Sequence, residues 1–238
     1  MLVVKRKNII IASVLAFVFI AFGFCFFALS NSNNTTASAN IVKIVLDAGH
    51  GGVDGGVSGI TTGVKESEIN LKIVKKLQNY LEGGGMSVTL TRNSEAGLYG
   101  IASATLKQKD MKKRKEIIEK ASPTLVVSVH LNQYSVSTRR GAQVFYKKTD
   151  VNGKRLAETI QNAFNEMPES TRDLSALAGD YYILNCTNFP SVIAECGYLS
   201  NPEEEALLIT ETYQDSIAYT LFKGICGYLA KESINYFN

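Results

Sequence analysis

The sequence predicts an α/β fold: a single domain with a mostly parallel, twisted sheet and helices on both faces, preceded by one N-terminal transmembrane helix. Three observations support this prediction. Short runs of β-branched residues, typical of buried strands, recur along residues 41–196. They alternate with segments whose apolar residues have helical spacing, an order that favours a parallel sheet covered on both faces. An uncharged apolar run, residues 9–29, precedes this domain.

The N-terminal segment has the composition of a membrane anchor. Lys5, Arg6 and Lys7 precede the 21 uncharged residues of 9–29. About 20 apolar residues span a bilayer, and a basic cluster before them stays in the cytoplasm. We therefore expect a cytoplasmic segment at 1–8, a single-pass anchor at 9–29, a linker at 30–40 and a domain at 41–233 on the outer side of the cytoplasmic membrane. A long signal peptide, cleaved near Ala39 to give a secreted protein, is the alternative.

The first half of the domain is predicted to contain three strands and two helices. Strands are expected in 41–50, 86–91 and 123–130. Helical spacing of four apolar residues predicts a helix that starts near Glu66 and stops at three consecutive glycines, and a second helix is expected at 107–121. The four residues are Ile69, Ile73, Leu77 and Leu81. Residues 92–106 are small and polar, which predicts a surface loop.

The second half continues the alternation. Strands are expected at 141–146, 181–184 and 191–196. Leu156, Ile160 and Phe164 form one stripe of a predicted helix at 151–167. A closing helix is expected at 213–230 from the same kind of spacing.

Composition argues against a nucleic-acid-binding protein and against a structural zinc knot. The chain has 25 Lys and Arg against 22 Asp and Glu, and without the three basic residues of the N-terminal segment the charges balance. A neutral domain gives no indication of nucleic acid binding. No CxxC motif occurs. We interpret Cys186, Cys196 and Cys226 as small buried apolar residues, with a bridge between Cys186 and Cys196 as the alternative.

Four side chains form a candidate site. His50 and His130, the two histidines of the chain, each end a predicted strand, where α/β sheets build their sites. Glu66 opens a predicted helix, and Glu195 ends the apolar run 191–195, where burying a carboxylate costs several kcal/mol without a partner. Two histidines and one carboxylate are a common ligand set for catalytic zinc, and a second carboxylate can transfer protons in hydrolysis. The residues alone do not choose between Glu66 and the nearby Glu68.

A glycine-rich loop follows the first strand. Residues 49–63 contain seven glycines in fifteen residues. The loop matches neither a Walker motif nor a dinucleotide fingerprint. Two interpretations stay open, a device for tight turns and a close approach of the backbone to substrate.

The motifs DAGHGG (47–52), KESEINL (65–71), SVHLN (128–132) and ECGYLSN (195–201) occur in one order along the chain. By these motifs, residues 41–230 resemble the zinc-dependent N-acetylmuramoyl-L-alanine amidases of the Amidase_3 type. The resemblance implies one Zn²⁺ per chain held by His50, Glu66 and His130, with Glu195 as the catalytic acid/base. It also implies hydrolysis of the amide between N-acetylmuramic acid and L-alanine in peptidoglycan. With one anchor and no wall-binding repeats, the chain is most similar to spore-cortex amidases of the CwlD kind, which prepare muramic acid for δ-lactam formation.

Three further residues are candidates for substrate binding or for supporting the ligands: Asp47, Asn132 and Asn185. Asn132 lies two residues after the second histidine, so the two share a face of the strand. Asn185 stands where many family members have a basic residue, which leaves a contact to a substrate carboxylate open. We interpret Arg92 and Arg114 as structural.

Two other functions and one partner remain hypotheses. A zinc carboxypeptidase acting on the stem peptide would use the same ligands, and a non-catalytic module would bind peptidoglycan without cutting it. In the loop 92–106, Leu98, Tyr99 and Ile101 are apolar residues among polar ones. They suggest a docking surface for an activating protein at the membrane surface. Packing of these three residues on the core is the alternative.

Overall fold

The computed structural model describes residues 41–98 and 105–236. The predicted cytoplasmic segment, anchor and linker of 1–40 lie outside this range, as do Tyr99 and Ile101 of the predicted docking loop. The chain divides into two units, Met1–Asn40 and Ile41–Asn238. Among the helices of the described residues, none is long and apolar enough to cross a membrane.

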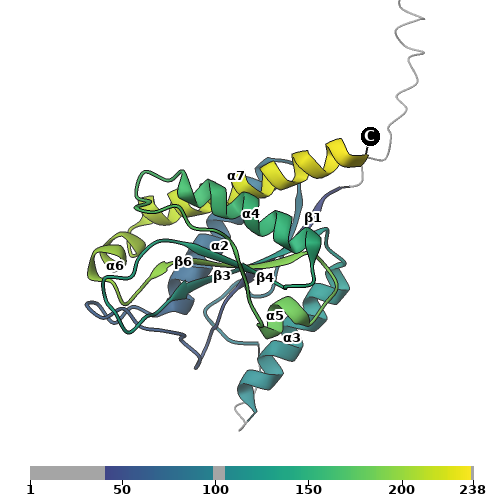
Figure 1. Ribbon diagram of the computed structural model, residues 1–238. Coiled ribbons are helices and arrows are strands. Elements are labelled where there is room, and N and C mark those ends of the chain that lie inside the picture. The colour runs from purple at the N-terminus through teal and green to yellow at the C-terminus, as the bar shows by residue number, and fades with distance from the viewer. Residues whose placement is uncertain (1–40, 99–104, 237–238) are drawn as a thin grey trace, which may run out of the picture. The chain divides into compact units, whose positions relative to one another are not determined.

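One sheet forms the centre of the domain (Figure 1). Its strands in the described range are β1 (Lys43–Ala48), β2 (Ser87–Leu90), β3 (Leu125–Asn132), β4 (Gln143–Tyr146), β5 (Leu177–Ala178) and β6 (Ser191–Tyr198), in the order β2-β1-β3-β6-β4-β5. Four neighbouring pairs are parallel, and β4 runs antiparallel to β6. The sheet is therefore mixed, and its mostly parallel character agrees with the prediction.

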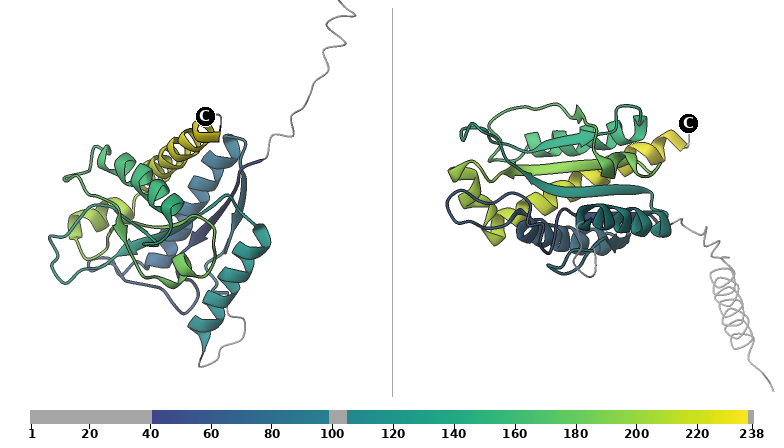
Figure 2. Two further views of the ribbon diagram at one scale, coloured as in Figure 1. Left: turned by 45° about the vertical axis from the view of Figure 1, so that its right-hand side comes forward. Right: turned by 90° about the horizontal axis from the view of Figure 1, so that it is seen from below.

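Helices cover both faces of the sheet. The helices α2 (Glu66–Gly83), α4 (Val151–Asn165) and α7 (Glu211–Tyr236) pack on one face, with α7 beside both of the others. On the opposite face lie α3 (Leu106–Ala121) and α5 (Tyr182–Asn185) (Figures 1 and 2). The short helix α6 (Pro202–Leu208) follows β6 directly. This is the predicted three-layer α/β arrangement.

Two apolar clusters correspond to the two faces. The larger lies under α2, α4 and α7 and contains Ile73, Leu77 and Leu221, each fully buried. The smaller joins Val45 of β1 to Ile118 of α3. Because successive side chains of a strand point to opposite faces, each buried strand supplies both clusters and reads as a continuous apolar run.

The predicted strand at 181–184 is wrong. These residues form the helical turn α5, in which the N–H groups of Leu184 and Asn185 both donate to the carbonyl of Tyr181, at 3.1 and 3.2 Å. Ile183 and Leu184 are adjacent and both buried in the cluster under α3. A strand would point one of these two side chains away from that cluster, whereas a helical turn buries both. The strand that pairs with the outer side of β4 is β5, a few residues before this helical turn.

The other differences are one additional helix and shifted ends of predicted elements. The helix α6 was not predicted, although Asn201 caps it by accepting from the N–H of Glu204 at 2.9 Å, and Pro202 occupies its first turn. α7 is longer at both ends than the predicted 213–230. Cys186, Cys196 and Cys226 are free, so the alternative of a bridge is wrong. Cys196 is buried as expected, whereas Cys186 and Cys226 are only half-buried.

Candidate metal centre and active site

Four segments that are distant in sequence meet at the carboxyl ends of the central parallel strands. His50 follows β1 in a left-handed conformation, with φ of 61°. His130 lies on β3, which begins and ends two residues later than the predicted 123–130 and so continues past the histidine to Asn132. Glu195 of β6 is the register partner of His130, and Glu66 is the first residue of α2. Three strand ends and the first turn of α2 thus bring all four predicted residues to the same end of the sheet.

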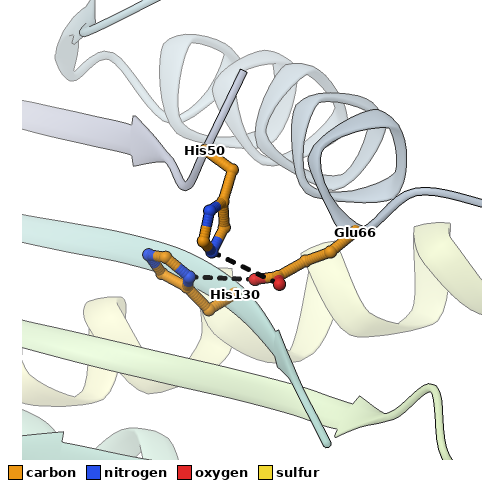
Figure 3. Close-up of side chains that lie close together, drawn as sticks. All are labelled: His50, Glu66 and His130. Carbon is orange, nitrogen blue, oxygen red and sulfur yellow. Dashed lines mark hydrogen bonds and ion pairs between the residues drawn. The ribbon is translucent and has the colours of Figure 1, made fainter. Parts of the chain in front are cut away.

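His50, Glu66 and His130 converge (Figure 3). Glu66 Oε1 lies 2.9 Å from His130 Nδ1, and Glu66 Oε2 lies 3.3 Å from His50 Nε2. One ligand atom from each residue falls within 4.8 Å of the other two. Two imidazole nitrogens and one carboxylate oxygen at this spacing fit a zinc ion, which takes His and carboxylate ligands at about 2.0–2.2 Å.

The surroundings of Glu66 distinguish it from Glu68. The Glu66 carboxylate is 2% exposed and accepts hydrogen bonds from the backbone N–H groups of Val57 (3.0 Å) and Leu131 (3.1 Å). The amide of Asn70 donates to the same carboxylate at 3.2 Å. Glu68 is exposed on the outer side of α2. The fold therefore aims Glu66, and not Glu68, at the two histidines.

His50 is oriented by a second carboxylate that sequence reasoning missed. Its Nδ1 lies 2.9 Å from Asp54 Oδ1, which leaves Nε2 directed at Glu66. Burial alone would lower the pKa of His50, but its hydrogen bonds and ion pairs with Glu66 and Asp54 raise that pKa to about 9. A carboxylate behind a ligating imidazole fixes its tautomer and ring orientation. The available signal was a carboxylate four residues after the histidine, inside the glycine loop.

Two glycines of this loop allow the ligand side chains to approach. A Cβ at Gly49 would lie 2.2 Å from Cε1 of the His130 ring, and one at Gly56 would lie 2.4 Å from Glu66 Oε2. Both distances are shorter than any real contact, so a side chain at either position would displace the histidine or the glutamate. At these two positions the glycines make room for the protein's own ligand residues.

Glu195 has the surroundings expected of a proton carrier. Its Oε2 atom is buried and has no hydrogen-bond partner among the described residues. Burial raises the pKa of its carboxyl, and the nearby His130 opposes this shift only in part. A buried carboxyl oxygen without a partner is costly, which indicates that it meets a group from outside the protein.

A cavity of about 320 Å³ opens beside the two histidines, between α3 and α5. The exposed surface of its walls is mainly apolar, but several charged side chains also line it, among them Asp54, Asp110 and Asp180. Besides these and the histidines, the walls include Lys107, Met111, Tyr181, Tyr182, Ile183 and Ile193. Concave sites with mostly apolar walls and a few polar groups are typical of substrate clefts.

Asp47 belongs to a buried ion-pair cluster beneath this cavity. Arg114 Nη1 donates to Asp47 Oδ1 at 2.5 Å, and Arg114 Nε donates to Asp110 at 2.6 Å. The hydroxyls of Ser128 and Thr91 also donate to Asp47, at 2.5 and 2.7 Å. Both carboxylate oxygens of Asp47 therefore accept hydrogen bonds from the protein itself. Asp47 thus stabilises the structure beneath the site and has no free oxygen for substrate.

The two predicted structural arginines brace the backbone that leads to His50. Arg114 donates to the carbonyls of Ala48 (2.9 Å) and His50 (2.6 Å). Arg92 donates to the carbonyls of Ala48 and Gly49, each at 2.9 Å. Both side chains are buried, at 4% exposure for Arg92 and 2% for Arg114. The structural interpretation of both arginines agrees with these contacts.

The two asparagine candidates lie apart from the metal ligands. Asn132 Oδ1 accepts from the N–H of Gln133 at 2.8 Å, and no hydrogen bond to either histidine is found for it in the described residues. Asn185 is exposed at the end of α5, where its amide donates to Asp180 (2.8 Å) and to the carbonyl of Tyr181 (3.0 Å). The structure therefore does not bring Asn185 to the site.

A supporting carboxylate on the unpredicted helix α6 holds the glycine loop. Glu205 is 1% exposed and accepts from the backbone N–H groups of Thr61 (2.9 Å) and Thr62 (2.8 Å). Asn70 Nδ2 ties the same loop to α2 through the carbonyl of Gly49 at 3.3 Å. The loop that carries His50 is thus fixed at both ends by buried polar groups.

The ion pair of Asp47 predicts an acid limit to stability. Burial would raise the pKa of Asp47, but Arg114 and the two hydroxyls lower it from 3.8 to about 2. A carboxyl with a lower pKa in the folded state stabilises the fold above pH 3.8, and this contribution is lost as the pH falls towards 2. The lowered pKa corresponds to about 2 kcal/mol of unfolding free energy.

Urea unfolding of the wild type and of Asp47→Asn between pH 2 and pH 6 measures this contribution. The stability advantage of the wild type should shrink as the pH falls through this range. Glu119→Gln, an exposed substitution on α3, serves as the control and should follow the wild-type pH profile. A stability difference between wild type and Asp47→Asn that stays constant with pH would contradict the assignment.

Comparison with known proteins agrees with this geometry. A family model described as N-acetylmuramoyl-L-alanine amidase matches residues 44–227. The chain belongs to the Amidase_3 family. The germination-specific N-acetylmuramoyl-L-alanine amidase of Bacillus subtilis is 32% identical to this amidase over 193 residues, which are 79% of this chain and 80% of the relative.

Solved structures show the same fold. The CwlD amidase from Clostridioides difficile, determined in complex with the GerS lipoprotein, is 38% identical with a TM-score of 0.76, and the match covers 79% of this amidase and 98% of that chain. An N-acetylmuramoyl-L-alanine amidase from Clostridium difficile 630 is 30% identical with a TM-score of 0.71, covering 81% and 98%. The predicted family resemblance is confirmed.

Proposed function

We propose that this amidase is zinc-dependent and hydrolyses the amide between N-acetylmuramic acid and L-alanine in peptidoglycan. The observation that carries the proposal is the convergence of His50, Glu66 and His130 beside Glu195, whose buried Oε2 has no hydrogen-bond partner among the described residues. The names of the family and of the relatives support the substrate class.

The chain's own residues supply ligand support and proton transfer. When bound, zinc lowers the pKa of a coordinated water towards about 7 and polarises the scissile carbonyl. Glu195 accepts a proton from the attacking water and returns it to the departing nitrogen of L-alanine. Asp54 holds the His50 ring, and the N–H groups of Val57 and Leu131 hold the Glu66 carboxylate. His50 and Glu66 therefore need little reorganisation before the reaction.

Mass spectrometry of muropeptides after digestion with the purified full-length chain tests the activity. An amidase releases the intact stem peptide and leaves the lactyl carboxylate on the sugar. A zinc carboxypeptidase would instead shorten the stem peptide, and a binding module would leave the muropeptides unchanged. Either of these two results would overturn the proposal.

Zinc binding separates the two candidate glutamates. Glu66→Gln is expected to weaken zinc binding by more than about tenfold, because it replaces an anionic ligand with a neutral amide. Glu68→Gln should bind zinc like the wild type, since its side chain faces away from the site. Calorimetric titration with zinc, after circular dichroism has shown that both variants are folded, makes the comparison. Equal affinities for the two variants would remove Glu66 from the ligand set.

We further propose a role in spore cortex maturation, in which removal of stem peptides precedes muramic-δ-lactam formation. The similarity to a germination-specific amidase and to a CwlD amidase supports this role. Spores that lack the gene should contain cortex without the δ-lactam. Normal δ-lactam content in such spores would contradict the proposal.

The site of action is proposed to be the outer face of the cytoplasmic membrane, with residues 9–29 as the anchor. Protease added to spheroplasts should then digest the catalytic domain. Protection of the domain would contradict this orientation, and its release into the medium would favour cleavage near Ala39.

An activating protein at the membrane surface is the last proposal from the sequence. Support comes from the CwlD relative, whose structure was solved in complex with the GerS lipoprotein. Within the proposed docking loop, Leu98 is half-buried and its N–H donates to Asp110 at 2.8 Å. Full activity of the purified chain on sacculi, unchanged by spore extract, would contradict the need for a partner.

A further inference from the structure

A hollow lined by arginines lies on the loop that leaves the strand of His130. Residues 133–142 connect β3 to β4, and β6 lies between these two strands (Figure 1). Because β4 runs antiparallel to β6, the loop crosses the carboxyl end of β6 at the same edge of the sheet as the metal ligands. The loop therefore lies next to the site, on the side where Glu195 is.

Buried polar contacts hold this loop in place. The N–H of Tyr134 donates to Ser200 Oγ at 3.0 Å, and the N–H of Gly141 donates to Glu204 Oε1 at 3.0 Å. Glu204 is 3% exposed and also accepts from the N–H of Tyr198 at 2.7 Å. Both ends of the loop are thus anchored to the segment that follows β6, which gives its side chains a defined arrangement.

The hollow has a volume of about 390 Å³ and a strongly basic lining. Three guanidinium groups and three hydroxyls line it, together with one valine, and the lining contains no carboxylate. The residues are Tyr134, Val136, Thr138, Arg139, Arg140, Thr171 and Arg172. Such a set of donors without an acceptor anion fits a carboxylate or phosphate group.

The charges of the hollow are only partly neutralised within the protein. Arg140 pairs with Glu203 at 2.9 Å, but Glu203 is 79% exposed, and ion pairs of this kind are weak. Arg139 lies over the Tyr134 ring and its side chain hydrogen-bonds the Tyr198 side chain, but its Nε is buried without a hydrogen-bond partner in the described part of the chain. Arg172 is exposed, and its side chain makes no described ion pair or hydrogen bond.

Two carboxylates near the hollow, the buried Glu204 and the half-buried Glu169, do not neutralise its arginines. Glu204 is taken up by the two backbone N–H groups that anchor the loop. Glu169 lines the adjoining hollow with Arg140 and Arg172, but it forms no ion pair with either of them among the described residues. The basic lining therefore remains available to an anion from outside.

We propose that this hollow binds a carboxylate of the substrate's stem peptide. The inference rests on the proposed function, in which Glu195 returns its proton to the departing nitrogen of L-alanine. The peptide side of the scissile bond then lies on the Glu195 side of the metal ligands, where the loop 133–142 follows. An extended peptide advances about 3.3–3.6 Å per residue, so the far end of a stem peptide lies several residues' length from the scissile bond, and the loop 133–142 lies on that side of the site. A peptide that is not cross-linked ends in a carboxylate, the group that an arginine fork recognises.

Two muropeptides that differ only at the stem terminus, carboxylate or carboxamide, test this assignment. For the carboxylate substrate, Arg172→Gln is expected to raise KM about tenfold with little change in kcat, because the lost contact is distant from the reacting bond. For the carboxamide substrate, KM should be the same in wild type and variant. Lys148→Gln, an exposed substitution after β4, is the charge-matched control and should change neither value.

Two results would overturn the assignment. One is an equal change in KM, or none, for both substrates. The other is an unchanged KM combined with loss of binding to a phosphate-rich wall polymer, which would assign the hollow to phosphate. Calorimetry with the free stem peptide and its carboxamide gives a readout that is independent of turnover. If the wild type cleaves neither muropeptide, the proposed function fails, and the binding data still decide about the hollow.

Discussion

Glu195→Gln is expected to reduce the turnover of muropeptides by about 10²–10⁴-fold while zinc content and fold stay unchanged. The amide has nearly the same shape as the carboxylate, but it can neither accept the water proton nor return it to the leaving amine. Glu195 is the register partner of His130, and its Oε2 has no hydrogen-bond partner among the described residues. The substitution therefore breaks no hydrogen bond at this oxygen. Because burial raises the pKa of this carboxyl, removing its charge should not lower stability.

Single-turnover kinetics on muropeptides, with zinc content and melting temperature measured on the same sample, make this comparison. Glu158→Gln, an exposed substitution on α4 away from both the metal ligands and the basic hollow, is the matched control and should retain wild-type rates. A Glu195→Gln variant that keeps near-normal turnover would exclude Glu195 as the proton carrier. A variant that loses zinc would show that the residue acts through the metal site.

The second large effect is expected for Arg114→Met, which should destabilise the fold by about 3–5 kcal/mol. Arg114 is 2% exposed and pairs with both Asp47 and Asp110. Its removal leaves two carboxylates without their counter-charge, one of them fully enclosed. It also removes the brace on the carbonyl of His50, so zinc affinity should fall together with stability.

Urea unfolding of a double-mutant cycle tests this prediction. The double variant Arg114→Met with Asp47→Asn should lose less unfolding free energy than the two single variants lose together, because Asp47→Asn removes the charge that Arg114→Met leaves uncompensated. Lys113→Met, an exposed neighbour on the same helix, should change stability little. Full additivity of the two buried substitutions would show that the ion pair is not the cause.

The sequence by itself determined the fold class and most of its elements. The apolar stripe of α2 and the β-branched runs of β1, β3 and β6 are local patterns. A helix or strand needs such a pattern to bury its side chains, irrespective of which elements it packs against. The local patterns misled at 181–184 because four residues are too few to establish a period. There, the packing of Ile183 and Leu184 under α3 decided the conformation.

The sequence also singled out His50, His130 and Glu195, since strand ends and motif order mark them without any knowledge of contacts. Only the tertiary structure decided which acid faces the histidines. It also revealed Asp54 behind His50 and the ion-pair cluster of Arg114 beneath the site. Glu66 and His130 are 64 residues apart, and Arg114 and Asp47 are 67 apart. Partners at such separations are brought together by the sheet order and by burial of charge, and neither of these leaves a periodic pattern in the chain.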